Sequence, residues 1–221
     1  MKSFLLFGIA LLLLQSCEYG ILYDQPQPGG IENLNNFPQK LIGKYCDDSS
    51  NVDIVIEKNR VIKISYYDIE ASKAEIDTLK DCKLIGDSLF LGDVQQFIHV
   101  DIINDSVFGV LTTPDTLFTI SQFNILRKLK SDYFLSLIHE SGNWQVIRLR
   151  QFKKENIEFS VIPQSVDFDK LNSITPIEQL KDHNDSILNY KVSPTFKQFE
   201  GMIRQGLFNK SEVYHKVKSG K

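Results

Sequence analysis

The chain lacks most of the signatures that assign a protein to a chemical class. No His-Glu-x-x-His motif, Gly-x-Ser-x-Gly elbow or phosphate-binding loop occurs in its 221 residues. Lys and Arg number 25 against 28 Asp and Glu, so the clustered basic excess of a nucleic-acid-binding protein is missing. The longest apolar run, Phe4 to Leu14, is too short for a bilayer core that needs about 20 residues. These absences predict no enzyme, no cofactor and no nucleic acid partner.

Metal-ligating residues are equally sparse, with four histidines and three cysteines. His99 and Asp101 share one face of an expected strand, a spacing that two metal ligands can have but that many ordinary strands share. No histidine lies at ligand spacing beside Cys46 or Cys82. We therefore predict no metal site, and a structural or solvent-exposed role for His99.

The N-terminal residues carry the clearest signal in the chain. Met1-Lys2 supplies a positive start, Phe4 to Leu14 is apolar, and Leu14-Gln15-Ser16-Cys17 follows. A charged start, a short apolar segment and a small residue before the cut are typical of an export signal. With the cysteine after the small residue, the segment resembles a bacterial lipoprotein signal. The resemblance implies removal of residues 1–16 and lipid on Cys17; the alternative is an ordinary secretory signal with a chance cysteine.

Lipidation of Cys17 leaves Cys46 and Cys82 as the remaining thiols of an exported chain, where disulfides can persist. In an antiparallel meander their segments can be neighbours, and a bridge could add roughly 3 kcal/mol by restricting the unfolded chain. Two buried free thiols that act as small hydrophobes are the equally weighted alternative. We predict a Cys46–Cys82 disulfide with no catalytic role.

Composition divides the chain after the signal into three parts. Residues 17–36 contain Gln25-Pro26-Gln27-Pro28-Gly29-Gly30 and several asparagines, which predicts a lipidated flexible tether. Residues 37–163 read as an antiparallel β domain, and residues 164–221 as a C-terminal appendage of mixed α and β structure. Hydrophobic content of 42% is enough for a core.

Period-two alternation predicts the strands of the β domain. One hairpin pairs Val52–Ile56 with Val61–Tyr66, and another pairs Tyr133–Glu140 with Trp144–Phe152. Asn156–Ile162 continues as a further strand. Short strands with almost no helical period predict a mainly β fold, in which an antiparallel meander forms a barrel or a sandwich.

The C-terminal appendage contains two helical patterns. Pro176 to Leu180 fits a short helix. Ser193 suits a cap before a second helix near residues 194–205, because Pro194 fits the first turn and the apolar residues from Phe196 onward fall on one face.

Asp followed by Ser or Thr and an aliphatic residue recurs five times. The simpler interpretation is turn chemistry before a strand. The triplets also resemble the O-glycosylation sequon of exported proteins of Bacteroidota, a group rich in such lipoproteins. That resemblance implies possible sugar attachment at Thr78, Ser88, Ser106, Thr116 and Ser186.

Leu41-Ile42-Gly43-Lys44-Tyr45 is faintly similar to the Gly-x-Trp signature of lipocalins, with Tyr45 in place of the tryptophan. The resemblance implies a ligand cavity inside a barrel. A side-chain-filled barrel with a glycine at a strand bend is the alternative.

These patterns predict a lipid-anchored envelope protein, held in the outer membrane and facing the periplasm or the surface, with a non-catalytic binding or interaction function. Its partners would be the membrane, through Cys17, and a protein. The first alternative is a lipocalin-like carrier of an apolar small molecule. The second is a hydrolase of envelope polymers, for which no motif is present.

The Cys17→Ala variant should be released from membranes, because it has no thiol to carry the lipid. Fractionation of cells into membrane and soluble parts checks this expectation, with Cys46→Ala as a control that stays in the membrane fraction. If Cys17→Ala is processed unchanged and remains with the membrane, the lipoprotein interpretation is wrong.

Overall fold

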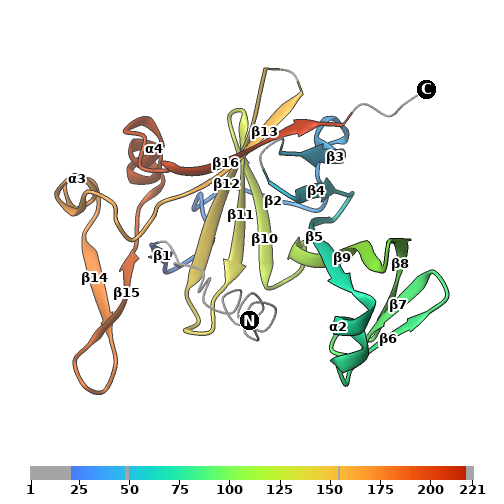
Figure 1. Cartoon of the computed structure of the whole chain (residues 1–221). Coiled ribbons are helices and arrows are strands. Elements are labelled where there is room, and N and C mark those ends of the chain that lie inside the picture. Colours follow the sequence, from blue (N-terminus) through green and yellow to red (C-terminus); the bar gives the residue numbers. More distant parts are fainter. Residues whose placement is uncertain (1–20, 48–49, 154, 218–221) are drawn as a thin grey trace.

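The computed structural model describes residues 21–47, 50–153 and 155–217. The expected signal and Cys17, which is expected to carry lipid, lie outside these residues. Within them the fold is mainly β and almost wholly antiparallel, as the sequence predicts (Figure 1). The sheet curls without closing, and β1 and β15 form its parallel pair among the described residues.

The strands in chain order are β1 (Leu22–Tyr23), β2 (Asn33–Leu34), β3 (Gly43–Cys46), β4 (Val52–Ile56), β5 (Arg60–Ser72), β6 (Cys82–Ile85), β7 (Ser88–Leu91), β8 (Gln96–Ile103), β9 (Ser106–Thr119), β10 (Asn124–Leu129), β11 (Asp132–Ile138), β12 (Trp144–Phe152), β13 (Asn156–Val161), β14 (Ile177–Lys181), β15 (Ile187–Val192) and β16 (Lys210–Lys216). The helices of the described residues are the 3-10 turn η1 (Gln39–Leu41), α2 (Lys73–Thr78), α3 (Phe168–Asn172) and α4 (Phe196–Arg204). The main order of paired strands is β14-β15-β1-β12-β13-β16-β3-β4-β5-β9-β8-β7-β6, with β11, β10 and β2 branching from β12.

Both predicted hairpins are present. β4 pairs with β5 through Val52↔Ser65 to Ile56↔Val61, and β11 pairs with β12 over seven residue pairs from Asp132↔Arg150 to Ile138↔Trp144. The predicted strand after residue 155 is β13, which pairs with β12. Alternation therefore located these strands, although β5 continues six residues beyond the predicted end at Tyr66.

The centre of the fold is β11, which is covered on both faces. Tyr133 and Leu135 point into the curl of the sheet, and Phe134 points to the opposite side. On that outer side Phe134, Phe199 of α4 and Phe208 form an edge-to-face cluster with ring centroids 5.1–6.0 Å apart. Helix α4 is thereby fixed to the back of the central strands.

Side chains fill the inside of the curl. Tyr45, Phe118 and Leu149 are at most 1% exposed, and the Tyr45 hydroxyl donates a hydrogen bond of 2.8 Å to the backbone oxygen of Leu41. The remaining fully or nearly buried members of this cluster are Phe37, Leu41, Ile54, Ile56, Val61, Leu126, Tyr133, Leu135, Ile157 and Tyr214. The interior is a packed core drawn from strands of both halves of the sheet.

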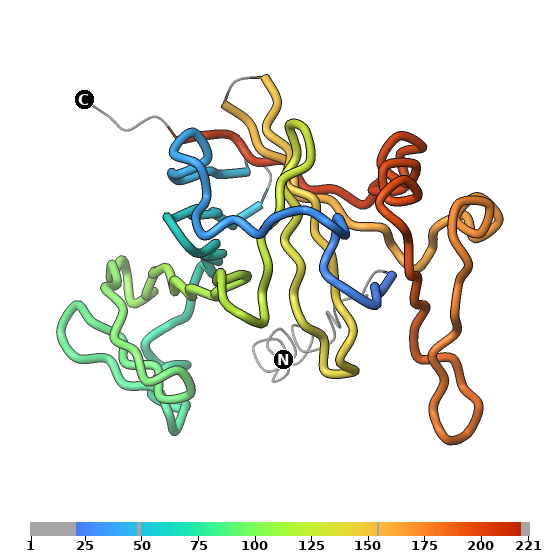
Figure 2. The backbone as a smooth tube through the Cα atoms, turned by 180° about the vertical axis from the view of Figure 1, so that it is seen from behind, coloured from blue at the N-terminus to red at the C-terminus, as the bar shows by residue number. Residues whose placement is uncertain are grey.

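Residues 21–36 are folded against the sheet, which corrects the predicted tether of residues 17–36 over this part. We call residues 21–34 the strap. Leu22 and Tyr23 of β1 are at most 1% exposed, and β2 pairs with β10 (Figure 2). Its Pro and Gly residues shape turns around a fully buried Gln27, whose backbone N–H donates to the Ser136 hydroxyl. The proline- and glycine-rich composition correctly predicts turns in this segment. It does not predict that the segment packs against the sheet.

A single arginine holds the strap to the outer face of the sheet. Arg127 of β10 donates hydrogen bonds to the backbone oxygens of Pro26 and Pro28 and, over 2.8 Å, to the side-chain oxygen of Asn33. A planar guanidinium suits this task because it presents several donors in a rigid fork.

The C-terminal part also differs from expectation. The helix predicted at residues 194–205 is α4, but its cap is Thr195 and not Ser193. The Thr195 hydroxyl accepts from the Gln198 N–H, and the Gln198 side chain accepts from the Thr195 N–H, which forms a capping box. This reciprocal pair requires the Thr-x-x-Gln spacing, which Ser193 lacks.

The helix expected at Pro176 to Leu180 is strand β14, because pairing with β15 supplies its backbone hydrogen bonds. Helix α3 forms instead over residues 168–172, capped by the Asp167 side chain. β16 joins the central sheet between β13 and β3. Residues 164–217 therefore contribute directly to the main sheet, which corrects the appendage predicted over residues 164–221 for the part that the structure describes.

Replacing Arg127 with Met should lower the free energy of unfolding by about 2 kcal/mol, because three acceptors of the strap lose a charged donor while the apolar stem is kept. Denaturant unfolding measures the loss. The control is Arg60→Met, which removes an exposed pair with Glu57 and should leave stability nearly unchanged, because solvent screens that pair. Equal losses in both variants would contradict the role of Arg127.

Candidate interaction surface

β5 and β9 form a long antiparallel pair that leaves the curled sheet. The chain between these two strands forms a separate group of elements at the far end of the pair. The pairing runs from Arg60↔Thr119 at the sheet to Ser72↔Ser106 at the tip. Beyond Tyr66↔Thr112 three further strands widen this pair into a sheet: β8 pairs with β9, β7 with β8, and β6 with β7. Helix α2 lies beside them (Figure 1). We call residues 66–112 the lobe. Both backbone views place it to one side of the molecule (Figure 2).

One face of the lobe sheet is covered and packed. Ile76 of α2 is 2% exposed and contacts a cluster built from alternate residues of the strands: Leu89, Ile98, Val100 and Val107, with Ile69, Ala71, Cys82, Leu84, Leu91 and Leu111 at its border. The helix begins with a capping box between Ser72 and Glu75. Gly109 lies opposite Val100, and a Cβ at Gly109 would approach the Val100 Cγ1 atom to 2.9 Å. Close packing on this face therefore requires the glycine.

The opposite face of the same sheet is uncovered and carries apolar side chains. Phe97 is 64% exposed, Ile103 58%, Ile85 50% and Val110 48%. We define the open face as the apolar residues Ile85, Phe90, Phe97, Ile103, Phe108 and Val110. Soluble proteins seldom leave contiguous apolar groups of this kind in water unless something binds there.

Strand register shows that the open face is continuous across four strands. Phe90 of β7 lies opposite Phe97 of β8, with ring centroids 4.9 Å apart. A surface hollow of about 420 Å³ lies over β8 and β9 and is lined by Gln96, Phe97, Ile98, His99, Asp101, Phe108, Gly109, Val110 and Thr112. The open face therefore includes a shallow depression over β8 and β9, whose lining mixes apolar side chains with polar ones.

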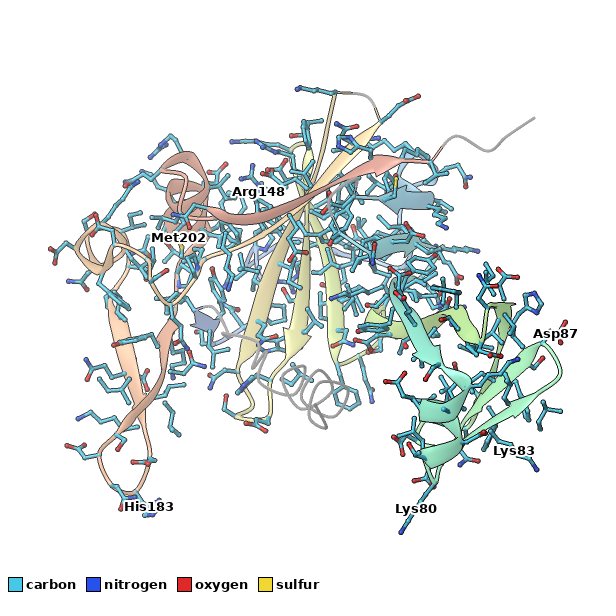
Figure 3. The ribbon with its side chains drawn as sticks, viewed as in Figure 1. Lys80, Lys83, Asp87, Arg148, His183 and Met202 are labelled. Atoms are coloured by element: carbon cyan, nitrogen blue, oxygen red, sulfur yellow. The ribbon has the colours of Figure 1, made fainter. Side chains whose placement is uncertain are left out.

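Carboxylates border this apolar surface. On the open side of the sheet, Phe108 lies between Asp101 of β8 and Glu70 of β5, and Asp68 lies opposite Val110. All three acids are exposed, and none forms an ion pair with another described residue. Lys83 of β6 is the neighbouring cation on this side, and Figure 3 labels it together with Asp87 on the lobe.

His99 and Asp101 lie on the open face, as the expected strand spacing requires. The His99 Nδ1 atom is 3.6 Å from a carboxylate oxygen of Asp87, and both side chains are more than 70% exposed. Among the described residues there is no group of three or more His, Cys, Asp or Glu that could hold a metal ion. The geometry of His99 is that of an exposed residue at the rim of the hollow.

Cys46 and Cys82 are both free thiols, so the structure corrects the predicted Cys46–Cys82 disulfide. Cys46 lies on β3 of the main sheet, and Cys82 lies on β6 of the lobe, six steps away in the strand order. β3 and β6 are near in sequence but separated in space, because the paired strands β5 and β9 place β6 in the lobe, away from the main sheet (Figure 1).

The five Asp-Ser/Thr positions fall into different settings. Ser88, Ser106 and Ser186 follow hairpin turns, and the backbones of Asn104, Asp105 and Asp185 have positive φ there. This is the turn chemistry expected of such residues. Thr78 ends α2, and Thr116 lies inside β9, so those two triplets are not turns before strands. Glycosylation at these sites stays a prediction.

The glycine of the lipocalin-like segment has a structural explanation. Gly43 has a φ of +148°, a conformation that favours glycine, and a Cβ there would lie 2.9 Å from the Lys216 Cε atom.

A second hollow, of about 280 Å³, lies beside the 2.9 Å ion pair of Lys130 and Glu200. Below it Asp132 binds Arg148, labelled in Figure 3, through two nitrogens of the guanidinium. This nearly buried pair joins β11 to β12.

Sequence reasoning located the lobe strands only in part and missed the open face. A local signal was present in the charges: residues 66–112 hold nine Asp and Glu against three Lys, a formal charge of −6 in a chain of −3. Alternation in residues 96–103 also indicates two faces, both carrying apolar residues. Neither signal says which face is left uncovered.

Comparison with models of protein families, with curated proteins and with solved structures found no match to this chain. No helix in the described part of the chain is long and apolar enough to cross a bilayer.

Both thiols should react with an alkylating reagent without prior reduction, and Cys82 should react slowly at neutral pH. Burial raises the pKa of Cys82, and the nearby carboxylates of Asp93 and Asp81 raise it further, so less reactive thiolate is present at a given pH. Mass mapping over a pH series measures each rate, with Cys82→Ser as the control that leaves Cys46 alone. An unreduced protein that takes up no label would show that the disulfide forms.

Proposed function

We propose that this protein is a lipid-anchored, non-catalytic interaction module of the bacterial cell envelope, and that its lobe binds a protein partner. The open face carries the proposal. Four of its side chains are about half exposed or more, and they lie on one side of a sheet whose other side holds the buried cluster under α2. An apolar surface that the chain itself leaves uncovered is what an intermittent partner requires.

The position of the lobe supports the same role. It is joined to the main sheet through the paired strands β5 and β9, and a two-stranded connection of this length holds the open face away from the rest of the molecule. A partner could therefore contact the open face without displacing the packed central sheet. The partner would gain apolar contact at Phe97, Phe108 and Val110 with little rearrangement of the lobe.

The folded strap bears on the proposed anchor. Cys17 and Ile21 are four residues apart, and an extended chain of that length spans at most about 14 Å. If Cys17 carries lipid, the fully buried Leu22 begins the fold close to the membrane surface. The anchor would then act as a short attachment, and the lobe would supply the reach that the predicted tether does not.

The packed interior favours an interaction module over a lipocalin-like carrier. A carrier needs an empty cavity inside its barrel, whereas Tyr45, Phe118 and Tyr133 occupy the inside of the curled sheet. The two surface hollows lie elsewhere, one on the lobe and one beside α4. No observation favours hydrolysis of envelope polymers.

In-cell photo-crosslinking tests the proposal. A photoreactive residue in place of Phe97 should form a discrete adduct with a protein, because Phe97 is the most exposed apolar residue of the open face. The matched control is the same residue in place of Leu188 on β15, which is equally exposed, at 64%, but lies outside the lobe. Absence of a protein adduct from Phe97, or the same adducts from both positions, would contradict the proposal.

A further inference from the structure

The open face combines apolar groups with carboxylates that form no ion pair with another described residue. Asp101 and Glu70 flank Phe108 on the two neighbouring strands, and Asp68 lies opposite Val110. None of these three carboxylates forms an ion pair with another described residue. An occupant of the face therefore meets an apolar centre and a negative rim at the same time.

The charge of the whole lobe acts in the same direction. Its nine acids and three lysines give a formal charge of −6, whereas the rest of the chain carries 22 basic and 19 acidic residues, a formal charge of +3. Excess charge of one sign on one part of a protein attracts partners of the opposite sign and raises their association rate. The acidic excess belongs to the part of the molecule that carries the open face.

The same charges disfavour two other occupants. A second copy seated face to face would bring two lobes of −6 together, and like charges across an interface suppress pairing. An anionic bilayer would also repel Asp68, Glu70 and Asp101. A cationic polypeptide with apolar side chains meets neither obstacle.

We infer that the open face of the lobe binds a basic amphipathic polypeptide segment, whose apolar side chains cover Phe97, Phe108 and Val110 while its Lys or Arg side chains pair with Asp68, Glu70 and Asp101. This inference rests on the proposed interaction function and specifies the chemistry of the partner. Binding should weaken as salt is raised, because the carboxylates are exposed and their attraction is screened.

The experiment uses the mature chain with Cys17→Ser, so that no detergent is needed, and a fluorescent 12-residue peptide of alternating Lys and Leu as the probe. Two further peptides separate the contributions: alternating Glu and Leu reverses the charge, and alternating Lys and Ser removes the apolar groups. Vesicles containing phosphatidylglycerol test the membrane alternative, and analytical ultracentrifugation tests self-association. Anisotropy titrations at low and moderate salt measure each affinity.

The Lys and Leu peptide should bind at least about tenfold more tightly than either comparison peptide, since it alone satisfies both the apolar centre and the acidic rim. The double variant Asp68→Asn with Asp101→Asn should lose about fivefold or more in affinity, and so should Phe97→Ser. Asp24→Asn and Leu188→Ser are the matched controls outside the lobe and should leave the affinity unchanged.

Equal binding of the Glu and Leu peptide, insensitivity to the lobe variants, vesicle binding through Phe97, or dimerisation through the open face would each overturn this inference. If crosslinking at Phe97 still yields a protein adduct, the interaction function stands and only the partner chemistry is wrong. If the photoreactive residue at position 97 gives no protein adduct of its own and Phe97→Ser leaves peptide binding unchanged, both proposals are wrong.

Discussion

Burial of β11 on both faces is the constraint on which the rest of the fold depends. Phe134 closes the outer side with α4, and Tyr133 and Leu135 close the inner side with the curled strands. A strand covered on two sides must supply apolar residues to both, and β11 is buried without interruption from Asp132 to Ser136. The strands that pair with β11 therefore have their positions set by two cores at once.

Polar groups on the outer side of this central region select one arrangement of the peripheral segments. Asp132 and Arg148 form a nearly buried ion pair across β11 and β12, and Arg127 binds the carbonyls of the strap. Breaking such pairs leaves a desolvated charge, so alternative dockings of these segments are unfavourable. The strap, α4 and the central sheet form one packed unit that includes both the N-terminal strand and the C-terminal helix.

The lobe is packed differently, because it has a small hydrophobic core on only one face of its sheet. Its helix covers one face, and the open face has no second layer within the described chain. Apolar burial on one side is enough to order a five-stranded sheet, while exposed apolar side chains on the other keep a surface available for association. The molecule thus combines a central body packed on both sides of its sheet with a lobe that has one open face.

The alternation of apolar and polar residues predicts some features of this fold and leaves others open. Period-two patterns and turn residues located β4 with β5, β11 with β12 and the helix after Pro194, because these features depend on neighbours in sequence. The export signal proposed before Cys17 is likewise an inference from sequence alone. Alternation says which side chains share a face, and it does not say what covers that face. Only the tertiary structure decided that the proline-rich strap docks on Arg127, that β14 replaces a helix, that Cys46 and Cys82 lie on strands far apart in the sheet, and that Phe97 and Val110 stay exposed, because each of these depends on which distant segment packs against the residues concerned.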